Sequence, residues 1–193
     1  MEMLANLPIM PFASPSAWEE WLAEHHAQAP GVWLKLAKKV SGTASVTYAE
    51  ALDVALCYGW IDGQKKPYDA LFWLQRFTPR RPKSGWSKLN TEKVAQLIGA
   101  GRMQPSGLRE VEAAKADGRW DTAYASQRTV IVPDDLRLEL ERRPEALAFF
   151  ASLNNVNRYA ICYRIETAKK PETRRARLET FLAMLESKQR LHP

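Results

Sequence analysis

The residues best suited to chemistry in this chain are basic side chains crowded into one short stretch. They are Arg76, Arg80, Arg81, Lys83 and Lys88. An arginine stays charged at physiological pH, and its planar fork of N–H groups matches phosphate and carboxylate oxygens. Trp60 and Trp86 belong to the same stretch and can stack a ring or a base beside the cations, a contact worth about 1–3 kcal/mol. The stretch predicts an anion-binding groove, although it carries no recognised nucleic-acid-binding motif.

A helix is expected to begin near Ser87, directly after the basic loop. The unsatisfied N–H groups of a helix N-terminus attract anions, so Ser87 and Lys88 can complete the predicted site. Alternatively, Ser87 only caps its own helix, which is the commoner role of a serine at such a position. The Gly-x-x-x-x-Gly-Lys-Ser/Thr spacing of a phosphate-binding loop is absent from the chain.

Asp62 and Gln64 lie on the predicted strand before the one that leads into the basic loop. Asp62 either pairs with Arg76 or Arg81 across a hairpin or acts as a general base, and we favour the ion pair. Gln64 can add a neutral hydrogen bond to the ligand. Both residues are therefore included in the predicted ligand-binding set.

The expected position of Cys57 argues against a role as a nucleophile. It falls at the C-terminal end of a predicted helix, where the helix dipole disfavours a thiolate, and no histidine is close in sequence. A buried packing thiol is the favoured interpretation. Three histidines, two of them adjacent, offer no zinc-ligand spacing, and no Gly-x-Gly-x-x-Gly motif occurs. We predict no catalytic residue, no metal and no cofactor.

Two helices with clear capping signals precede the basic stretch. Ser14 is the expected N-cap of the first, with Pro15 in its first turn, where the missing N–H costs nothing. Thr47 and Glu50 have the capping-box spacing and open the second helix. Gly59 is expected to end that helix in a left-handed conformation.

The strands are predicted from alternating apolar and polar residues. Residues 32–39 alternate in this way, and residues 60–66 and 71–77 predict two further strands around a turn. A tight hairpin turn at Asp62-Gly63 is the competing interpretation. The prolines of 78–85 exclude regular structure and predict a stiff, extended loop. Together these segments predict a small, mostly antiparallel sheet of about three strands.

Helices are expected in most of the remaining chain. They begin near Ser87, Pro105, Pro133, Pro144, Asn154 and Pro171. Residues 119–132 have little periodicity and predict a linker. The expected fold class is α+β, in which a module of residues 1–118 carries the small sheet with helices and the basic-aromatic loop. A C-terminal helical module of residues 133–193 follows the linker.

Three motifs of the chain resemble one bacterial protein family. They are ALCYGWIDGQ at 55–64, QRFTPRRPKSGWSKLN at 75–90 and NRYAICYRIETAKKPETRRARLETFLAML at 157–185. These segments resemble the YdeI/OmpD-associated family, and the last is similar to its C-terminal helical module, called OmdA. The resemblance implies an α+β N-terminal part and a helical tail. It also implies association with an outer-membrane porin and protection against bacteriocins or cationic peptides, which we interpret as a stress-response role.

Composition and charge bound the remaining possibilities. The chain has 193 residues and a net charge of +6, which suits one domain or one domain with a small appendage. The excess positive charge lies in 76–93 and 158–193, and clustered charge attracts anions. The N-terminus lacks the features of a secretory signal, and no apolar stretch is long enough to span a membrane. Cytoplasm is the expected location.

Three functional hypotheses follow from these observations. The first is a cytosolic protein that binds an anionic ligand, such as a nucleotide, nucleic acid or phosphorylated metabolite. It expects that replacing Arg80 and Arg81 with alanine weakens binding without lowering the melting temperature. The second is an enzyme acting on a phosphorylated or carboxylated small molecule, with Asp62 as its base. The third is a protein-interaction module that docks a partner through the C-terminal helices.

Overall fold

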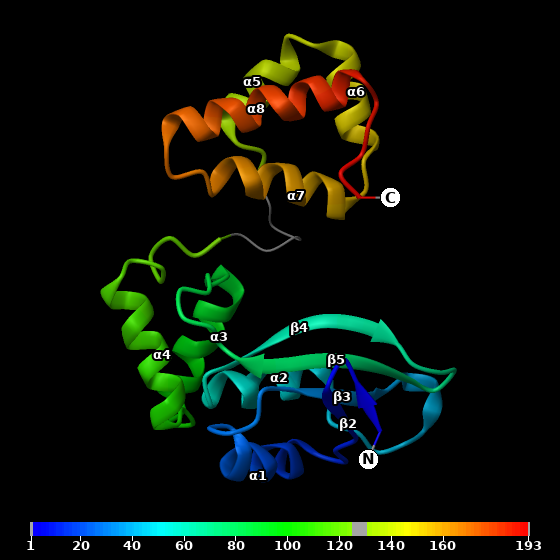
Figure 1. Ribbon diagram of the computed structural model, residues 1–193, viewed down its shortest axis with the longest axis vertical. Coiled ribbons are helices and arrows are strands. Elements are labelled where there is room, and N and C mark those ends of the chain that lie inside the picture. Colours follow the sequence, from blue (N-terminus) through cyan, green and yellow to red (C-terminus); the bar gives the residue numbers. More distant parts are fainter. Residues whose placement is uncertain (1, 125–130, 193) are drawn as a thin grey trace. The chain divides into compact units, whose positions relative to one another are not determined.

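The structure, a computed structural model, describes residues 2–124 and 131–192 (Figure 1). Contacts group the chain into two compact units. Unit 1 contains residues 1–86 and 90–122, and unit 2 contains residues 87–89 and 123–193. Residues 125–130, which belong to the predicted linker, lie outside the described residues. The α+β fold class predicted from the sequence is confirmed, whereas the predicted module boundaries remain a prediction.

The capping signals of unit 1 start its first two helices as expected. Helix α1 spans Pro15–His25, and the Ser14 hydroxyl accepts a hydrogen bond from the Ala17 N–H at 3.2 Å. Helix α2 spans Tyr48–Cys57 and begins with a complete capping box between Thr47 and Glu50. Gly59 follows α2 with a φ of +77°, the left-handed conformation predicted for it.

The sheet of unit 1 has five strands in the order β1-β2-β3-β5-β4. Its strands are β1 Met3–Leu4, β2 Leu7–Met10, β3 Val32–Ala37, β4 Trp60–Pro67 and β5 Phe72–Pro79. All pairs are antiparallel except β2 with β3. The expected number of about three strands was too low, because β1 and β2 are too short to show alternation. Ala5 and Asn6, both with positive φ, form the turn between β1 and β2.

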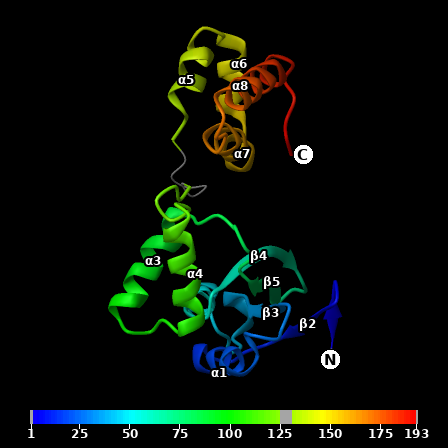
Figure 2. The same cartoon turned by 60° about the vertical axis from the view of Figure 1, so that its left-hand side comes forward.

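The two faces of this sheet differ. On one face, β3 presents Val32, Leu34 and Leu36, all buried. Helices α1 and α2 cover this face (Figures 1 and 2), and the Trp18 ring of α1 lies 5.8 Å from the Phe77 ring of β5. The opposite face, which we call the open face, carries a smaller cluster of Ile9, Trp33 and Leu74. In unit 1 as described, no helix lies over the open face (Figures 1 and 2).

Helices α3, Lys88–Gly99, and α4, Pro105–Ala116, follow the sheet in the chain. A Cβ built on Gly107 of α4 would stand 2.2 Å from the carbonyl oxygen of Cys57, so α4 packs directly against the end of α2. Only glycine permits this approach. The contact places α4 beyond one end of the sheet and leaves the open face uncovered by it (Figure 2).

In the described part of unit 2, four helices surround an apolar core. They are α5 Asp134–Glu141, α6 Pro144–Ser152, α7 Asn155–Glu166 and α8 Pro171–Glu186. Leu136, Leu140 and Ile161 are among the fully buried side chains of this core. Buried Asn157 fastens the C-terminal segment, because its side-chain oxygen accepts hydrogen bonds from the N–H groups of Leu191 and His192. In the part of the chain that the structure describes, no helix is both long and apolar enough to cross a membrane.

Candidate anion site on the open sheet face

Strands β4 and β5 bring two of the sequence motifs together through an irregular pairing. Asp62 is opposite Phe77 and Lys65 is opposite Gln75, so β4 has one residue more than β5 between these pairs. Buried Gln75 stabilises this β-bulge by donating a hydrogen bond from its side-chain amide to the Gly63 carbonyl at 2.9 Å. Bulges of this kind often redirect a side chain beside a functional site.

Arg76 is the side chain that this bulge positions. It is paired with Trp33 of β3 and therefore points to the open face, opposite to its neighbour Phe77. A Cβ built on Gly63 would stand 3.0 Å from Arg76 Nε and 3.3 Å from one of its terminal nitrogens. The guanidinium group thus lies against the β4 backbone, where any larger residue than glycine would crowd it.

The guanidinium of Arg76 has no protein partner among the described residues. Its Nε is shielded from solvent, yet no described group accepts a hydrogen bond from it. Two ion pairs of unit 1 join Lys93 to Asp53 and Arg119 to Asp117, and neither includes Arg76. A half-buried cation without a counter-ion loses hydration without compensation, so an incoming anion would be favoured there.

Asp62 does not pair with Arg76 or Arg81, and that prediction was wrong. The bulge sets Asp62 opposite Phe77, which directs its carboxylate to the face away from Arg76. Its Oδ2 accepts a hydrogen bond from the Tyr48 hydroxyl at 2.8 Å. Burial and this neighbouring carboxylate raise the pKa of Tyr48 well above its ordinary range. Gln64 is exposed in the bulge, where its backbone carbonyl lies 3.4 Å from the Gln75 amide.

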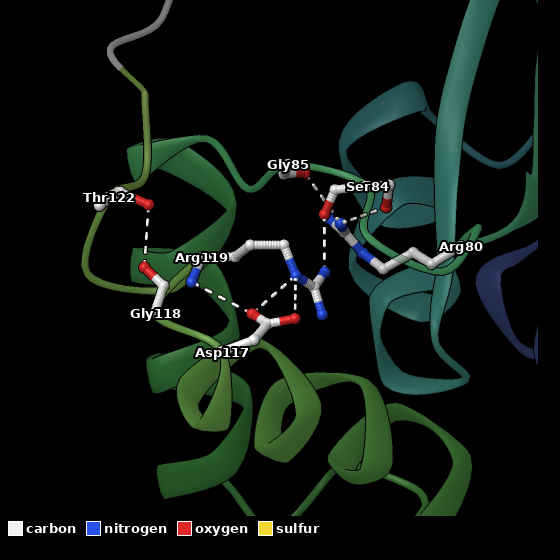
Figure 3. A network of polar contacts seen from close by, with 7 residues as sticks. All are labelled: Arg80, Ser84, Gly85, Asp117, Gly118, Arg119 and Thr122. Carbon is white, nitrogen blue, oxygen red and sulfur yellow. Dashed lines mark hydrogen bonds and ion pairs between the residues drawn. The ribbon is translucent and has the colours of Figure 1, made fainter. Parts of the chain in front are cut away.

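Arg80 is buried, whereas the sequence predicted that it is exposed on the loop. Its side chain is only 7% exposed and its guanidinium carbon lies 3.4 Å from the centre of the Trp86 ring. One terminal nitrogen donates hydrogen bonds to the Ser84 hydroxyl at 3.4 Å and to the Gly85 carbonyl at 3.2 Å (Figure 3). Arg80 therefore shapes the loop that follows β5, and the loop is turned rather than extended, with the Ser84 N–H donating to the Arg81 carbonyl.

A second arginine, Arg119, also contacts this loop and was not predicted from the sequence. Arg119 donates a hydrogen bond to the Ser84 carbonyl at 2.8 Å and pairs with both oxygens of Asp117 (Figure 3). The ring of the next residue, Trp120, lies 5.0 Å from the ring of Trp86 in the loop. No pattern in the sequence signals a contact across 35 positions.

The two predicted stacking residues are buried in the structure. Trp60 is 1% exposed and its indole N–H donates to the His26 carbonyl at 3.2 Å, while Trp86 is 2% exposed. Because both rings are buried, neither can stack on a ligand in this conformation. Arg81 and Lys83 are exposed on the loop, the latter with a φ of +66°. Of the predicted cations in unit 1, these two and Arg76 are thus the ones that can meet an anion.

Two protein-family models match the chain, each over a different part of it. Residues 10–110 match the model described as a domain of unknown function, DUF8412, which covers just over half of the chain. Residues 129–188 match the model OmdA, described as bacteriocin-protection, YdeI or OmpD-associated. The chain belongs to the DUF8412 family and carries an OmdA domain. The predicted YdeI/OmpD-associated family is thereby confirmed. No curated protein and no solved structure gives a significant match.

The motifs around Arg76 fall within the DUF8412 match, and only the third motif falls within the OmdA match. Strands β4 and β5, the bulge and Arg76 are therefore all features of the DUF8412 domain. Ser87 and Lys88 group instead with unit 2, where Ser87 bridges to Tyr124 and the Lys88 N–H donates to the Tyr124 carbonyl at 2.9 Å. The predicted residues consequently do not all belong to one unit.

Two lysines of the DUF8412 domain accompany Arg76 on the open face, and sequence analysis missed both. Lys66 of β4 is paired with Leu74, and its Nζ lies 5.6 Å from the centre of the Trp33 ring. Lys35 of β3 is also paired with Leu74, from the other side. The register of each strand determines the face to which these lysine side chains point. For Lys66 this register depends on the bulge at residues 62–65 of β4. A pattern of alternate residues could have indicated Lys35 but not Lys66.

Proposed function

We propose that this protein binds an anionic, phosphorylated ligand on the open face of the sheet, with Arg76 as the anchor. The observation that carries the proposal is the guanidinium of Arg76, which has no partner among the described residues and is held against Gly63 by the bulge. A planar guanidinium suits phosphate oxygens, because its parallel N–H groups can each donate to a different oxygen. A nucleotide, a nucleic acid or a phosphorylated metabolite would meet this requirement.

The surrounding charges support an anion over a neutral ligand. Lys35 and Lys66 lie on the same face as Arg76, and Arg81 and Lys83 are exposed on the loop after β5. Cations grouped in this way raise the local concentration of anions and speed their arrival. We further propose a cytoplasmic role in stress or bacteriocin protection, for which the description of the OmdA model is the support.

A thermal-shift panel tests the proposal. All seven tryptophans lie in unit 1, so intrinsic fluorescence follows the unfolding of the unit that contains Arg76. The ligands are ATP, short single- and double-stranded DNA, a sugar phosphate, pyrophosphate and inorganic phosphate. A ligand present at 100 times its dissociation constant adds about 2.7 kcal/mol, which should raise the melting temperature by roughly 5–10 °C.

The decisive comparison is between Arg76→Met and Arg81→Met. The first removes the anchor charge but keeps most of the side-chain volume, and it should abolish the ligand-induced shift. The second removes an exposed charge from the same segment and should leave at least half of the ligand-induced shift. No shift with any ligand, or an undiminished shift in Arg76→Met, would reject the proposal.

A second candidate function is docking of a protein partner through unit 2. The observation in its favour is a groove of about 840 Å³ along α8, lined by apolar and small side chains together with Gln189, Arg164 and Arg177. None of the described residues that line it is acidic. A photo-crosslinking residue placed at Thr180, inside the groove, should capture one defined partner. The same residue at Leu138, which is exposed on α5 and outside the groove, should not.

The enzymatic alternative finds less support in the geometry. It requires Asp62 to face the cations, and the strand register directs Asp62 to the opposite face of the sheet from Arg76. Among the described residues, no group of three or more histidine, cysteine or acidic side chains is placed to hold a metal ion.

A further inference from the structure

A pocket of about 340 Å³ lies where the chain leaves β2, beside Lys35 of β3. It lies between residues 11–13, which follow β2, and the loop of residues 43–45. Phe12 and Phe72 contribute apolar walls, and Lys35 contributes the charge. Pockets of roughly this volume hold small organic ligands in many proteins.

Backbone hydrogen bonds fix the walls of this pocket. The Val46 N–H donates to the Phe12 carbonyl at 2.9 Å, which joins the two walls. The Ala37 N–H donates to the Ser45 hydroxyl at 3.2 Å, and that hydroxyl donates to the Val46 carbonyl at 3.1 Å. The loop is therefore attached to both β3 and the segment after β2. A ligand would enter a cavity that exists before it binds.

Lys35 is held at this pocket by aromatic rings and not by a carboxylate. Its Nζ lies 4.2 Å from the centre of the Tyr68 ring and 4.6 Å from that of Phe72. No ion pair or side-chain hydrogen bond of Lys35 occurs among the described residues, and the Glu2 carboxylate accepts instead from the Tyr68 hydroxyl at 2.6 Å. Ring contacts supply neither a counter-charge nor an oxygen acceptor, so the ammonium group can still pair with a carboxylate.

We propose that this pocket binds a small monocarboxylate with an apolar body, whose carboxylate pairs with Lys35. One ammonium group neutralises one negative charge, and the apolar walls disfavour a second charge that would lose its hydration. A fatty or aromatic acid fits this combination better than a phosphate. The proposal goes beyond the Arg76 site, because the pocket is lined by neither Arg76 nor Gly63.

Isothermal titration of the full chain with sodium octanoate tests this inference, with 1-octanol as the neutral comparison. Octanoate should bind the wild-type protein at least 10-fold more tightly than octanol. Lys35→Met keeps the apolar stem and removes the charge, and it should lower octanoate affinity at least 10-fold, which corresponds to about 1.4 kcal/mol. Ala44→Trp should fill the pocket from its exposed rim while keeping the charge of Lys35, and it should abolish binding of both compounds.

Three outcomes would overturn the inference. These are no octanoate binding to the wild-type protein, unchanged affinity in Lys35→Met, and unchanged affinity in a folded Ala44→Trp variant. Arg76→Met separates this site from the proposed phosphate site. Octanoate binding should survive that substitution, whereas the shift caused by phosphorylated ligands should be lost. Loss of octanoate binding in Arg76→Met would likewise contradict a separate pocket.

Discussion

Arg76 and Arg80 have opposite roles although only three residues separate them. Arg80 is buried, stacks on Trp86 and donates to its own loop. Arg76 is held in place by the shape of β4 and has no partner among the described residues. The residue type and the local charge are alike in both cases. What distinguishes them is the burial of the side chain and the hydrogen-bond acceptors around it.

Replacing Arg80 should therefore destabilise the protein, contrary to the expectation from sequence. We expect Arg80→Ala to lower the free energy of unfolding of unit 1 by about 2 kcal/mol, because it removes the stacking on Trp86 and two hydrogen bonds. Urea denaturation followed by tryptophan fluorescence measures this change. Arg81→Ala, on an exposed neighbour, should stay within about 0.5 kcal/mol of the wild type. Equal stability of the two variants would show that Arg80 does not hold the loop.

Both cysteines should be unreactive in the folded protein. Burial raises the pKa of the Cys57 thiol and of the Cys162 thiol to about 11 in each case. At pH 8 only about one thiol in a thousand would be ionised, and the thiolate is the reactive form. Ellman's reagent should therefore label the native chain slowly and both cysteines rapidly in urea. Rapid labelling of the native chain would revive Cys57 as a candidate nucleophile.

At the scale of elements, local signals in the sequence predicted most of the fold. Ser14, Thr47 and Gly59 act through their nearest neighbours, so the starts of α1 and α2 and the end of α2 could be predicted from them. The bulge and the contact between Arg119 and Ser84 depend on residues distant in sequence. The faces of Asp62 and Lys66 follow from the bulge, which explains why the predicted ion pair was wrong and why Lys66 was missed.

Helices α5 and α8 are joined by an ion pair whose strength should depend on pH. Arg174 donates to both oxygens of Asp135, at 2.7 and 2.8 Å, and this holds the pKa of Asp135 below its ordinary value of about 3.9. The pair stabilises unit 2 above that value, and the contribution is lost as the pH falls through the lowered pKa of the folded state.

The acid sensitivity of unit 2 should therefore decrease when the ion pair is removed. Arg174→Met should be less stable than wild type at pH 7, and the difference between the two should shrink below about pH 4. Far-UV circular dichroism measures the unfolding of both proteins at each pH. Tryptophan fluorescence recorded in parallel follows the unfolding of unit 1 alone. A difference that stays constant from pH 7 to pH 2 would contradict this role of Asp135.

At the scale of the whole molecule, the +6 net charge does not by itself predict tight binding to nucleic acid. Arg80 is buried and Arg174 is paired within unit 2. Among the described residues, the open face offers three cations, namely Lys35, Lys66 and Arg76. A binding surface of this size can neutralise only about three phosphates.

The salt dependence of oligonucleotide binding should reflect that limit. If single-stranded DNA binds on the open face, the logarithm of its affinity should fall against the logarithm of salt concentration with a slope of about −2, since each phosphate contributes about 0.7. Fluorescence anisotropy at several salt concentrations gives the slope. A slope steeper than about −4 would place binding on a larger surface than the open face.

The bulge in β4 has a further consequence, for the solubility of the protein. Strand β4 is at the edge of the sheet, and its outer N–H and C=O groups could otherwise pair with the edge of a second copy. Gly63 and Gln64 interrupt its regular spacing, and Lys65, Lys66 and Pro67 complete the strand with two charges and a residue that cannot donate a hydrogen bond. The irregularity that positions Arg76 thus also protects the sheet from edge-to-edge aggregation.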